Sequence, residues 1–465
     1  MKNEINIVDL FCGCGGNASG MDRAIRKAGL TYRGLAINHW KVAVDTMRAN
    51  FPLMTTLDCK IEEAVPGDLM KRTVHILWAS PSCTHHSRAC GGRPRSNQLR
   101  SQPEYVITWL TQCDVRTLIV ENVPEFTEWG PLDTENRPIK DRKGETFKAW
   151  LKMIESLGYQ VEWRILNCAD YGDATTRRRF FLMATKVGLP KPEFPEPTHG
   201  DHVKGRRQWR SSRECLDLSN KGRSIFGRKH PLSEKTLARL ADGARKYWGL
   251  EITGDMLVKL SDPNRRLEPF LVKLRNNEKH DPTDRPISTI TSGGRHHMLV
   301  QLICDHQNHG KAEPPDRPMK TVSTHDHFSL ATLVLGQHGA ASCRLSSDPL
   351  PTIACKGAVR MIEPIVVDNA NGGTIRGAGE PINTITLKDQ HMMALPVLED
   401  GRRFDILVRM LEPRELARAH SLPDDFVLTG NKTEQTKQIG NSVPAETAAA
   451  LCRKMLEYCM KGLNK

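Results

Sequence analysis

The sequence predicts an α/β fold, a doubly wound and mostly parallel sheet, together with a second, β-rich domain. In about the first 190 residues, short apolar runs alternate with amphipathic stretches, as strands and helices do in a parallel sheet. The expected strands are Ile5–Val8, Gly34–Ile37, Val74–Leu77, Thr117–Val120 and Phe180–Met183. The amphipathic stretches include Met21–Lys27 and Ala43–Asn50, which we expect to be helices. Farther along, an internal repeat of Pro-x-x-Thr-(Ile/Val) indicates an array of short hairpins.

Length and charge narrow the classes of function. A chain of 465 residues is long enough for two or three domains with a sizeable core. Lys and Arg number 67 against 54 Asp and Glu, a formal net charge of +13. A surface of this sign suits a phosphate polymer, so we expect a nucleic acid as partner. Charge alone leaves the matter open, because many basic proteins bind no nucleic acid.

The cysteines and the N-terminus bear on the compartment. The 13 cysteines are irregularly spaced and include no C-x-x-C pair, which is typical of reduced thiols. Residues 1–5 lead into a strand pattern without a signal peptide, and no apolar run reaches the length of a membrane span. We therefore expect a cytoplasmic protein without membrane contact.

The first strand-to-helix junction is rich in glycine. The strand that starts at Ile5 runs through Asp9 into Leu10-Phe11-Cys12-Gly13-Cys14-Gly15-Gly16. Glycines at such a junction allow a ligand to approach the backbone at the carboxyl edge of a parallel sheet. The G-x-G-G spacing, with no Lys-Ser or Lys-Thr after it, argues against a nucleoside triphosphate site. A plain tight turn is the alternative.

The next two strand ends carry polar residues that would complete a pocket. Asn38 and His39 end the second strand, and Asp58 and Cys59 end the third. Asn38 is suited to a ribose hydroxyl and Asp58 to an exocyclic amine. Taken singly, each is also an ordinary polar loop residue.

Two further strands each end near a reactive side chain. Cys83 follows Val74–Leu77, and Glu121 follows Thr117–Val120 directly. These groups suit covalent chemistry on a pyrimidine ring, in which the thiol adds to the ring and the carboxyl group holds or protonates a ring nitrogen. Zinc binding at Cys83 does not fit, because C-x-H-H-x3-C is not an established tetrahedral set and would consume the thiol. We therefore expect no metal.

The rest of the chain divides into three parts. Residues 196–275, introduced by prolines, form a strongly basic linker or hinge region. Residues 276–404 hold four repeats of about 32 residues, with cores that start at Pro286, Pro318, Pro349 and Pro381. The repeats are either purely structural or a surface that contacts DNA grooves. Residues 405–465 return to a helical pattern, and we join them with residues 1–195 into one catalytic, ligand-binding domain.

Six motifs occur in the order that one enzyme family shows. They are Asp9-Leu10-Phe11-x-Gly13-x-Gly15-Gly16, Pro81-Ser82-Cys83, Glu121-Asn122-Val123, Thr175-x-Arg177-x-Arg179, Arg414–Arg418 with Pro423–Phe426, and Gln438–Pro444. With them the chain resembles the DNA cytosine-5 methyltransferases, and among these a phage- and prophage-associated branch. Four positions depart from the family pattern: Ser82 replaces a proline, Thr175 a glutamine, Asn38 an acid and His39 an aromatic residue.

The resemblance implies the fold of S-adenosylmethionine-dependent methyltransferases, with a target recognition domain in residues 276–404. It also implies S-adenosylmethionine as cofactor, bound at the glycine-rich turn and the neighbouring strand ends. The residues that it places at the cofactor are Asp9, Phe11, Gly13, Gly15, Gly16, Asn38, His39, Asp58, Cys59, Pro81, Asn441, Ser442 and Val443.

The resemblance assigns the chemistry to Cys83, Glu121, Arg177 and Arg179. The Cys83 thiolate would add to carbon 6 of cytosine, and Glu121 would hold ring nitrogen 3 and the amino group. One arginine would contact the base, and the other would fix the site or a phosphate. The cytosine must be flipped out of the duplex, and residues 85–100 would close over the DNA. The residues expected at the DNA are Ser87, Arg88, Arg93, Arg95 and Thr175.

The expected function is methylation of cytosine carbon 5 in double-stranded DNA at a specific short sequence. An RNA or tRNA cytosine-5 methyltransferase is one alternative. Classic RNA enzymes are disfavoured because Glu121 stands where they have their cysteine, and the tRNA-specific relative of the DNA family, which keeps the DNA-type motifs, is disfavoured because it lacks a recognition region as long as residues 281–398. An inert repeat-based DNA-binding protein is the other, disfavoured by the intact Cys83 and Glu121. We expect a bacterial or phage-encoded protein that is associated with the nucleoid and acts as a monomer on DNA, and functional pairing with a restriction endonuclease is an open alternative.

Overall fold

A computed structural model describes most of the chain. The described residues are 4–81, 102–135, 137–220, 222–225, 232–248, 250–252, 257–260, 270–273, 280–290, 297–304, 333–335, 343–345, 365–368, 374–377, 391–393, 397–398 and 404–461. The chain divides into two compact units. Unit 1 comprises residues 1–216, 284–295 and 412–465, and unit 2 comprises residues 217–283 and 296–411.

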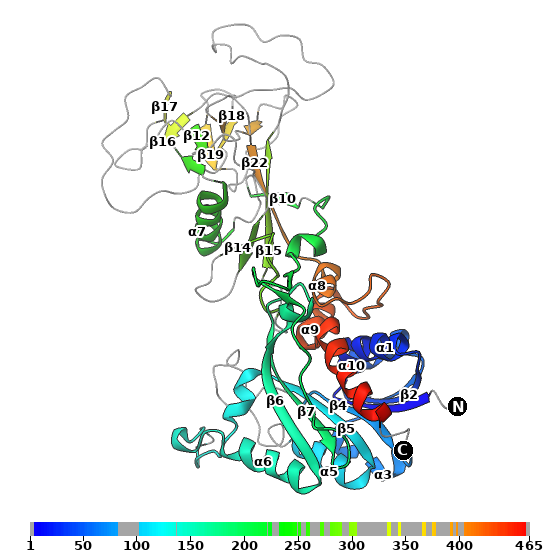
Figure 1. The fold of residues 1–465 in the computed structure, drawn as a ribbon. Helices are drawn as coiled ribbons and strands as arrows, with labels where there is room; N and C mark the ends of the chain where they lie inside the picture. The colour runs from blue at the N-terminus through cyan, green and yellow to red at the C-terminus, as the bar shows by residue number, and fades with distance from the viewer. Residues whose placement is uncertain are drawn as a thin grey trace. The chain divides into compact units, whose positions relative to one another are not determined.

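Unit 1 is built on a seven-stranded sheet with the order β3-β2-β1-β4-β5-β7-β6 (Figure 1). The strands in that order are Met54–Asp58, Thr31–Asn38, Glu4–Leu10, Val74–Ala79, Val115–Asn122, Arg178–Lys186 and Tyr159–Asn167. Every pair from β3 to β5 is parallel, whereas β7 is antiparallel to both of its neighbours. The predicted α/β class with a mostly parallel sheet is confirmed.

Helices cover both faces of this sheet. On one side α1 (Gly16–Lys27) packs on α10 (Ala445–Lys461), and on the other α5 (Glu104–Gln112) packs on α6 (Glu145–Ser156) (Figure 1). Large side chains such as Trp109, Phe126 and Trp150 fill the second side with an aromatic cluster. The other helices among the described residues of unit 1 are α2 (Lys41–Asn50), α3 (Pro66–Leu69), α8 (Pro413–Ala419), α9 (Lys432–Asn441) and the 3-10 helices Ile61–Glu63, Pro124–Glu128, Lys140–Arg142, Cys168–Tyr171 and Ser212–Cys215.

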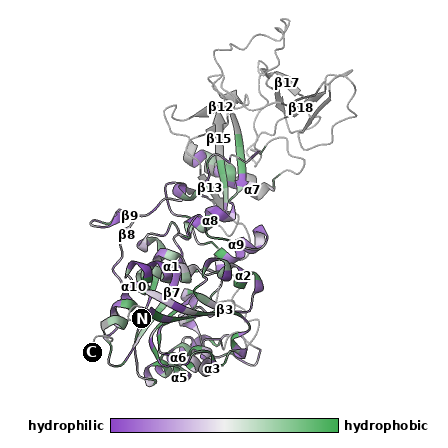
Figure 2. Ribbon diagram, turned by 90° about the vertical axis from the view of Figure 1, so that its right-hand side faces the viewer, coloured by the Kyte–Doolittle hydropathy of each residue, from purple (hydrophilic) through white to green (hydrophobic). Residues whose placement is uncertain are grey.

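Two short strands lie in the stretch that the sequence marks as basic. They are β8 (His199–Gly200) and β9 (Arg207–Gln208), which pair with each other, and β9 is strongly hydrophilic (Figure 2). In the described part of the chain, no helix combines the length and the apolar character needed to cross a bilayer.

Unit 2 is rich in strands. The largest sheet among its described strands is antiparallel, with the order β10-β22-β15-β13-β14, formed by Arg223–Ser224, Phe404–Met410, His297–Cys304, Phe270–Lys273 and His280–Pro282. Within its described residues, unit 2 also has three small sheets. One contains Leu250–Ile252, Leu257–Leu260 and Val397–Leu398, the second contains Leu333–Leu335 and Cys343–Leu345, and the third contains Ile365–Asp368, Thr374–Gly377 and His391–Met393. The α-helix Glu234–Gly243 continues into a π-helical turn, Ala244–Trp248.

The repeats are described only in part. The core of the first, Pro286–Ile290, is described, and the cores that start at Pro318, Pro349 and Pro381 lie outside the described residues. The first core is grouped with unit 1, and β15 (His297–Cys304), which follows it, is in unit 2. The predicted domain boundaries and the recognition role of residues 276–404 stay predictions.

Candidate active site

The glycine-rich turn after β1 has an unusual backbone. Phe11 adopts a φ of 59°, Gly13 a φ of 55° and Gly15 a φ of 90°. The left-handed region is uncommon for a bulky residue such as Phe11, and residues held there cluster at functional sites. The Cys12 N–H donates to the Ile37 carbonyl at 3.2 Å, which ties the turn to the end of β2. The turn therefore lies at the carboxyl edge of the sheet in a defined conformation.

The glycines of the turn differ in their surroundings. A Cβ on Gly13 would meet nothing within 4 Å, whereas one on Gly15 would lie 2.5 Å from the Met47 sulfur of α2. A Cβ on Gly16 would lie 2.3 Å from the Val443 carbonyl oxygen and 2.9 Å from the Ser442 Cβ. Gly16, Ser442 and Val443, all predicted at one site, are thus brought into contact. Open space remains at Gly13.

Asp9 lies below the turn with a fully buried side chain. Its Oδ1 accepts a 2.7 Å hydrogen bond from Asn17 Nδ2 in α1, and its Oδ2 has no partner within the described residues. Burial raises the pKa of Asp9 to about 8, and the Asn17 hydrogen bond opposes this. Asp9 therefore ties β1 to the start of α1 and supports the turn from inside.

The neighbouring strand ends carry the other predicted pocket residues. Asn38 and Asp58 are partners in the parallel register of β2 and β3, and the Cys59 N–H donates to the Asn38 carbonyl at 3.2 Å. The Asn38 Oδ1 accepts from the Trp40 N–H at 2.9 Å, which fixes the amide at the start of α2. His39 and Asp58 are exposed, and Asn441, at the end of α9, is exposed as well. Exposed polar groups therefore lie beside the glycine turn.

A second cluster lies at the ends of β4, β5 and β7. Glu121 on β5 is 7% exposed, and its Oε1 lies 3.2 Å from Arg179 Nε on β7. The Asn122 Nδ2 donates to the Pro81 carbonyl at 3.2 Å, directly after β4. Burial raises the pKa of Glu121, while Arg179, Arg177 and the Ser80 hydroxyl oppose the shift. This buried, hydrogen-bonded carboxyl group can hold a proton or stabilise a developing positive charge.

The two predicted arginines occupy different surroundings. Arg179 keeps a side chain that is 13% exposed, whereas Arg177 is 2% exposed and donates from Nη1 to the Ile290 carbonyl at 3.0 Å. Thr175 is fully buried. The predicted nucleophile Cys83 and the predicted DNA contacts Ser87, Arg88, Arg93 and Arg95 lie outside the described residues.

Comparison with known proteins shows the family of the chain. The family model described as C-5 cytosine-specific DNA methylase matches residues 5–248 and 356–457, which is more than half of the chain. This chain belongs to that family. The matched ranges include the glycine turn, Glu121 and both arginines.

Three relatives illustrate the range of the family. DNA (cytosine-5)-methyltransferase 1 of Mus musculus is 28% identical over 215 residues, 42% of this chain and 12% of that protein. DNA (cytosine-5)-methyltransferase PliMCI of Paracentrotus lividus is 24% identical over 517 residues, all of this chain and 29% of that protein. Type II methyltransferase M.XorII of Xanthomonas oryzae is 27% identical over 200 residues, 41% of this chain and 43% of that protein. The chain thus spans well under two thirds of each relative.

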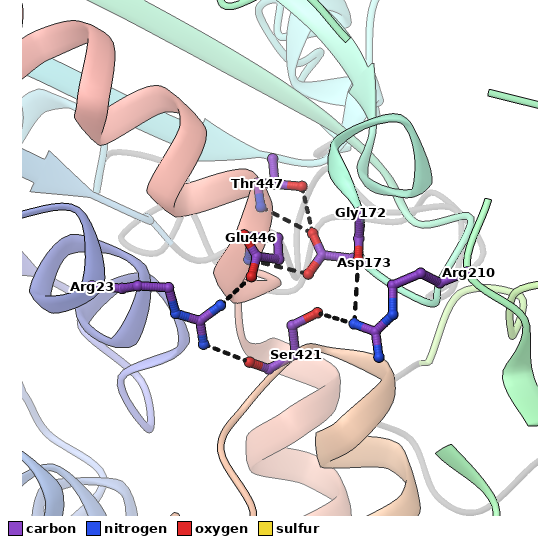
Figure 3. A network of polar contacts seen from close by, with 7 residues as sticks. All are labelled: Arg23, Gly172, Asp173, Arg210, Ser421, Glu446 and Thr447. Carbon is purple, nitrogen blue, oxygen red and sulfur yellow. Dashed lines mark hydrogen bonds and ion pairs between the residues drawn. The ribbon is translucent and has the colours of Figure 1, made fainter. Parts of the chain in front are cut away.

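A polar network that sequence reasoning missed supports the site of this DNA methylase family member (Figure 3). Asp173 accepts from the Glu446 and Thr447 N–H groups at 3.1 and 3.0 Å and from the Thr447 hydroxyl, at the first turn of α10. Arg210 donates to the Gly172 carbonyl at 3.4 Å, and Arg23 pairs with Glu446. The network fixes the loop before Thr175 against the segment that follows Val443, so it joins the two halves of the site.

Burial raises the pKa of Asp173 to about 6, and the hydrogen bonds at α10 oppose this. The sequence feature that could have indicated Asp173 is its position as an acidic residue directly after Tyr171-Gly172 and before the arginine motif.

His420 is a second residue that the sequence did not indicate. It is fully buried and pairs through Nδ1 with the Ser442 hydroxyl at 3.0 Å. Burial, with the charges of Arg177 and Arg179, lowers the pKa of His420 well below its usual value.

Proposed function

We propose that this protein transfers a methyl group from S-adenosylmethionine to carbon 5 of cytosine in double-stranded DNA, at a specific short sequence. The observation that carries the proposal is the buried Glu121 carboxyl group, paired with Arg179 at 3.2 Å beside the end of β4. Two residues after Pro81 at that end, the sequence places Cys83. Membership of the C-5 cytosine-specific DNA methylase family supports the same reaction.

The chemistry proposed for the base needs a nucleophile and a partner for the ring. The Cys83 thiolate adds to carbon 6, and electron density moves to carbon 5, which becomes nucleophilic. Glu121 holds ring nitrogen 3 and the amino group, and Arg179 keeps the carboxyl group oriented. After carbon 5 has taken the methyl group, a base removes its proton and the carbon 6–sulfur bond breaks, which releases Cys83. The target cytosine has to leave the base stack for this chemistry.

The residues around the glycine turn fit S-adenosylmethionine, which supplies an electrophilic methyl group when bound. The open space at Gly13 admits a ligand close to the backbone, and Asn38, His39 and Asp58 present polar groups at the same sheet edge. Phe11, Cys59, Pro81, Asn441, Ser442 and Val443 complete the proposed set. Asp9 supports this set from below through Asn17.

The partner and setting are proposed from charge and from the relatives. The net charge of +13 favours DNA, and a monomer is sufficient because unit 1 brings together residues for both halves of the site. The name of the Xanthomonas relative, a type II methyltransferase, supports pairing with a restriction endonuclease. We propose that the protein is bacterial or phage-encoded and lies at the nucleoid in the cytoplasm.

A methylation assay tests the proposal. Purified protein is incubated with unmethylated genomic DNA and radiolabelled S-adenosylmethionine, and bisulfite sequencing then reads the base and its sequence context. We expect the wild-type protein to methylate duplex DNA, and Cys83→Ala to abolish turnover while Cys90→Ala, in the same segment, retains it. Equal turnover by Cys83→Ala contradicts the covalent mechanism, and methylation of tRNA in place of DNA contradicts the substrate.

A further inference from the structure

The first of the four repeats is part of unit 1. Its core, Asp284-Arg285-Pro286-Ile287-Ser288-Thr289-Ile290, lies in the range 284–295 that clusters with unit 1, whereas residues 217–283 and 296–411 form unit 2. The chain therefore leaves unit 2, enters unit 1 for 12 residues and returns. A repeat that only continued a recognition surface would not need this excursion.

Backbone hydrogen bonds hold the first repeat on the arginine motif. The Ile287 N–H donates to the Ala174 carbonyl at 2.9 Å, and the Thr176 N–H donates to the Ile287 carbonyl at 3.0 Å. These bonds flank Thr175 and form a parallel bridge between Thr175 and Ile287. Because both segments contribute main-chain groups, the contact fixes the register of the repeat against the motif.

Side chains reinforce this docking. Ile287 is fully buried and Ile290 is 2% exposed, so the repeat contributes apolar side chains to the interior of unit 1. The Arg285 carbonyl accepts from the Ser212 N–H at 2.6 Å, and the Arg285 guanidinium pairs with Asp201. A segment fixed at both ends of its core is not free to follow a DNA groove.

The docked repeat also reaches the reactive cluster. The Ile290 carbonyl accepts the Arg177 Nη1–H at 3.0 Å, and the positive charge of Arg177 acts on the Glu121 carboxyl group. Arg177 is 2% exposed, so it is less accessible to a base than Arg179, which pairs with Glu121 directly. The geometry separates a positioning arginine from one that faces the site.

We propose that the first repeat is a docking clip of the catalytic unit, which holds Arg177 beside Glu121, and that it is not a DNA-reading hairpin. The catalytic consequence of this proposal rests on the proposed function, whereas the docking of the repeat on unit 1 is independent of it. Arg177 is accordingly a positioning residue.

Hydrogen exchange tests the docking without any substrate. The second repeat supplies matched controls, because Asp316-Arg317-Pro318-Met319 corresponds to Asp284-Arg285-Pro286-Ile287. We expect slow exchange of the Thr176 and Ile287 amides in the wild-type protein, and at least tenfold faster exchange of the Thr176 amide in Ile287→Ala but not in Met319→Ala. Rapid exchange of both amides in the wild-type protein would overturn the docking, whether or not the protein methylates DNA. If Ile287→Ala does not fold, Arg285→Ala and Arg317→Ala serve as the milder pair.

Steady-state kinetics test the catalytic consequence. We expect Ile287→Ala, or Arg285→Ala in its place, to lower kcat severalfold with the KM for DNA and the methylated sequence unchanged, and the matched second-repeat variant to leave kcat unchanged. We also expect Arg177→Gln to raise the pKa of Glu121, because the carboxyl group loses a neighbouring positive charge, and so to move the limb of the kcat–pH profile that Glu121 sets to higher pH. Arg178→Gln should not move it. A changed target sequence with unchanged kcat in the first-repeat variant would overturn the clip and make this repeat a DNA reader. An inactive wild-type protein would instead refute the proposed function and leave the exchange result to decide the docking.

Discussion

The two halves of the proposed site are built on different physical principles. The half at the glycine turn is shaped by close approach: Gly16 lies directly against Ser442 and Val443, and Gly15 against α2. The half at β5 and β7 depends on charge, because the buried Glu121 carboxyl group is balanced by arginines. The first half should therefore be sensitive to added volume and the second to lost charge. Substitutions that change only one property can test this difference.

Glu121→Gln should have the largest effect on activity. The substitution keeps the volume but removes the charge that pairs with Arg179. We expect kcat to fall about a hundredfold to a thousandfold, the range for loss of one stabilising group at a reacting centre. The affinity for S-adenosylmethionine, measured by calorimetry, should stay within about twofold of the wild-type value, a tolerance well below the tenfold that 1.4 kcal/mol represents. Glu128→Gln, which alters an exposed ion pair with Lys143, is the control. A loss of cofactor affinity as large as the loss of kcat would show that the two halves are not separate.

Gly16→Ala should affect stability and cofactor binding, whereas Glu121→Gln should leave cofactor binding nearly unchanged. The added Cβ would lie 2.3 Å from the Val443 carbonyl oxygen, and a backbone group cannot move aside as a flexible side chain can. We expect a loss of about 1–3 kcal/mol in the free energy of unfolding, as for other overpacked sites. We also expect weaker binding of S-adenosylmethionine. Thermal unfolding and calorimetry measure both. Gly67→Ala is the matched control, because its Cβ would meet no atom within 4 Å. Equal stability of the Gly16 variant and the wild type would contradict the close-packed description of this half.

The sequence allowed much of the framework to be predicted. The five apolar runs are present as β1, β2, β4, β5 and β7, and the strand expected to end at Asp58 is present as β3; Asn38, Asp58 and Glu121 lie at the carboxyl ends of their parallel strands. The strand Tyr159–Asn167 was not expected, because as an edge strand it alternates polar and apolar residues and has no continuous apolar run. A search for apolar runs finds buried strands and misses such edges.

The contacts that refine the site could not be predicted from local pattern. Arg177 is separated from Ile290 by 113 positions, and Asp173 from Thr447 by 274. Neither pair has a sequence signal of its own, because one partner in each is a backbone group. Every residue has a backbone carbonyl, and every residue except proline has a backbone N–H. The motif predicted one arginine at the base and one that fixes the site or a phosphate without saying which is which, and only their tertiary partners distinguish Arg177 from Arg179.

Asp173 lies in the network that joins the two halves of the site. Its titration should change the free energy of unfolding with pH, which is the smallest effect that we expect. Burial raises its pKa from the usual 3.8 to about 6, so the folded protein binds a proton that the unfolded chain has already released. This contribution to stability is full below about pH 4 and is lost as the pH rises through about 6, with a slope of at most about 1.4 kcal/mol per pH unit. Chemical denaturation at several pH values should show this decline in the wild type and not in Asp173→Asn. The variant should also be less stable near pH 7, because an amide cannot accept all the hydrogen bonds from Glu446 and Thr447. If the free energy of unfolding has the same slope between pH 4 and 6 in both proteins, Asp173 does not titrate there. The contact between the two halves of the site would then depend on packing alone.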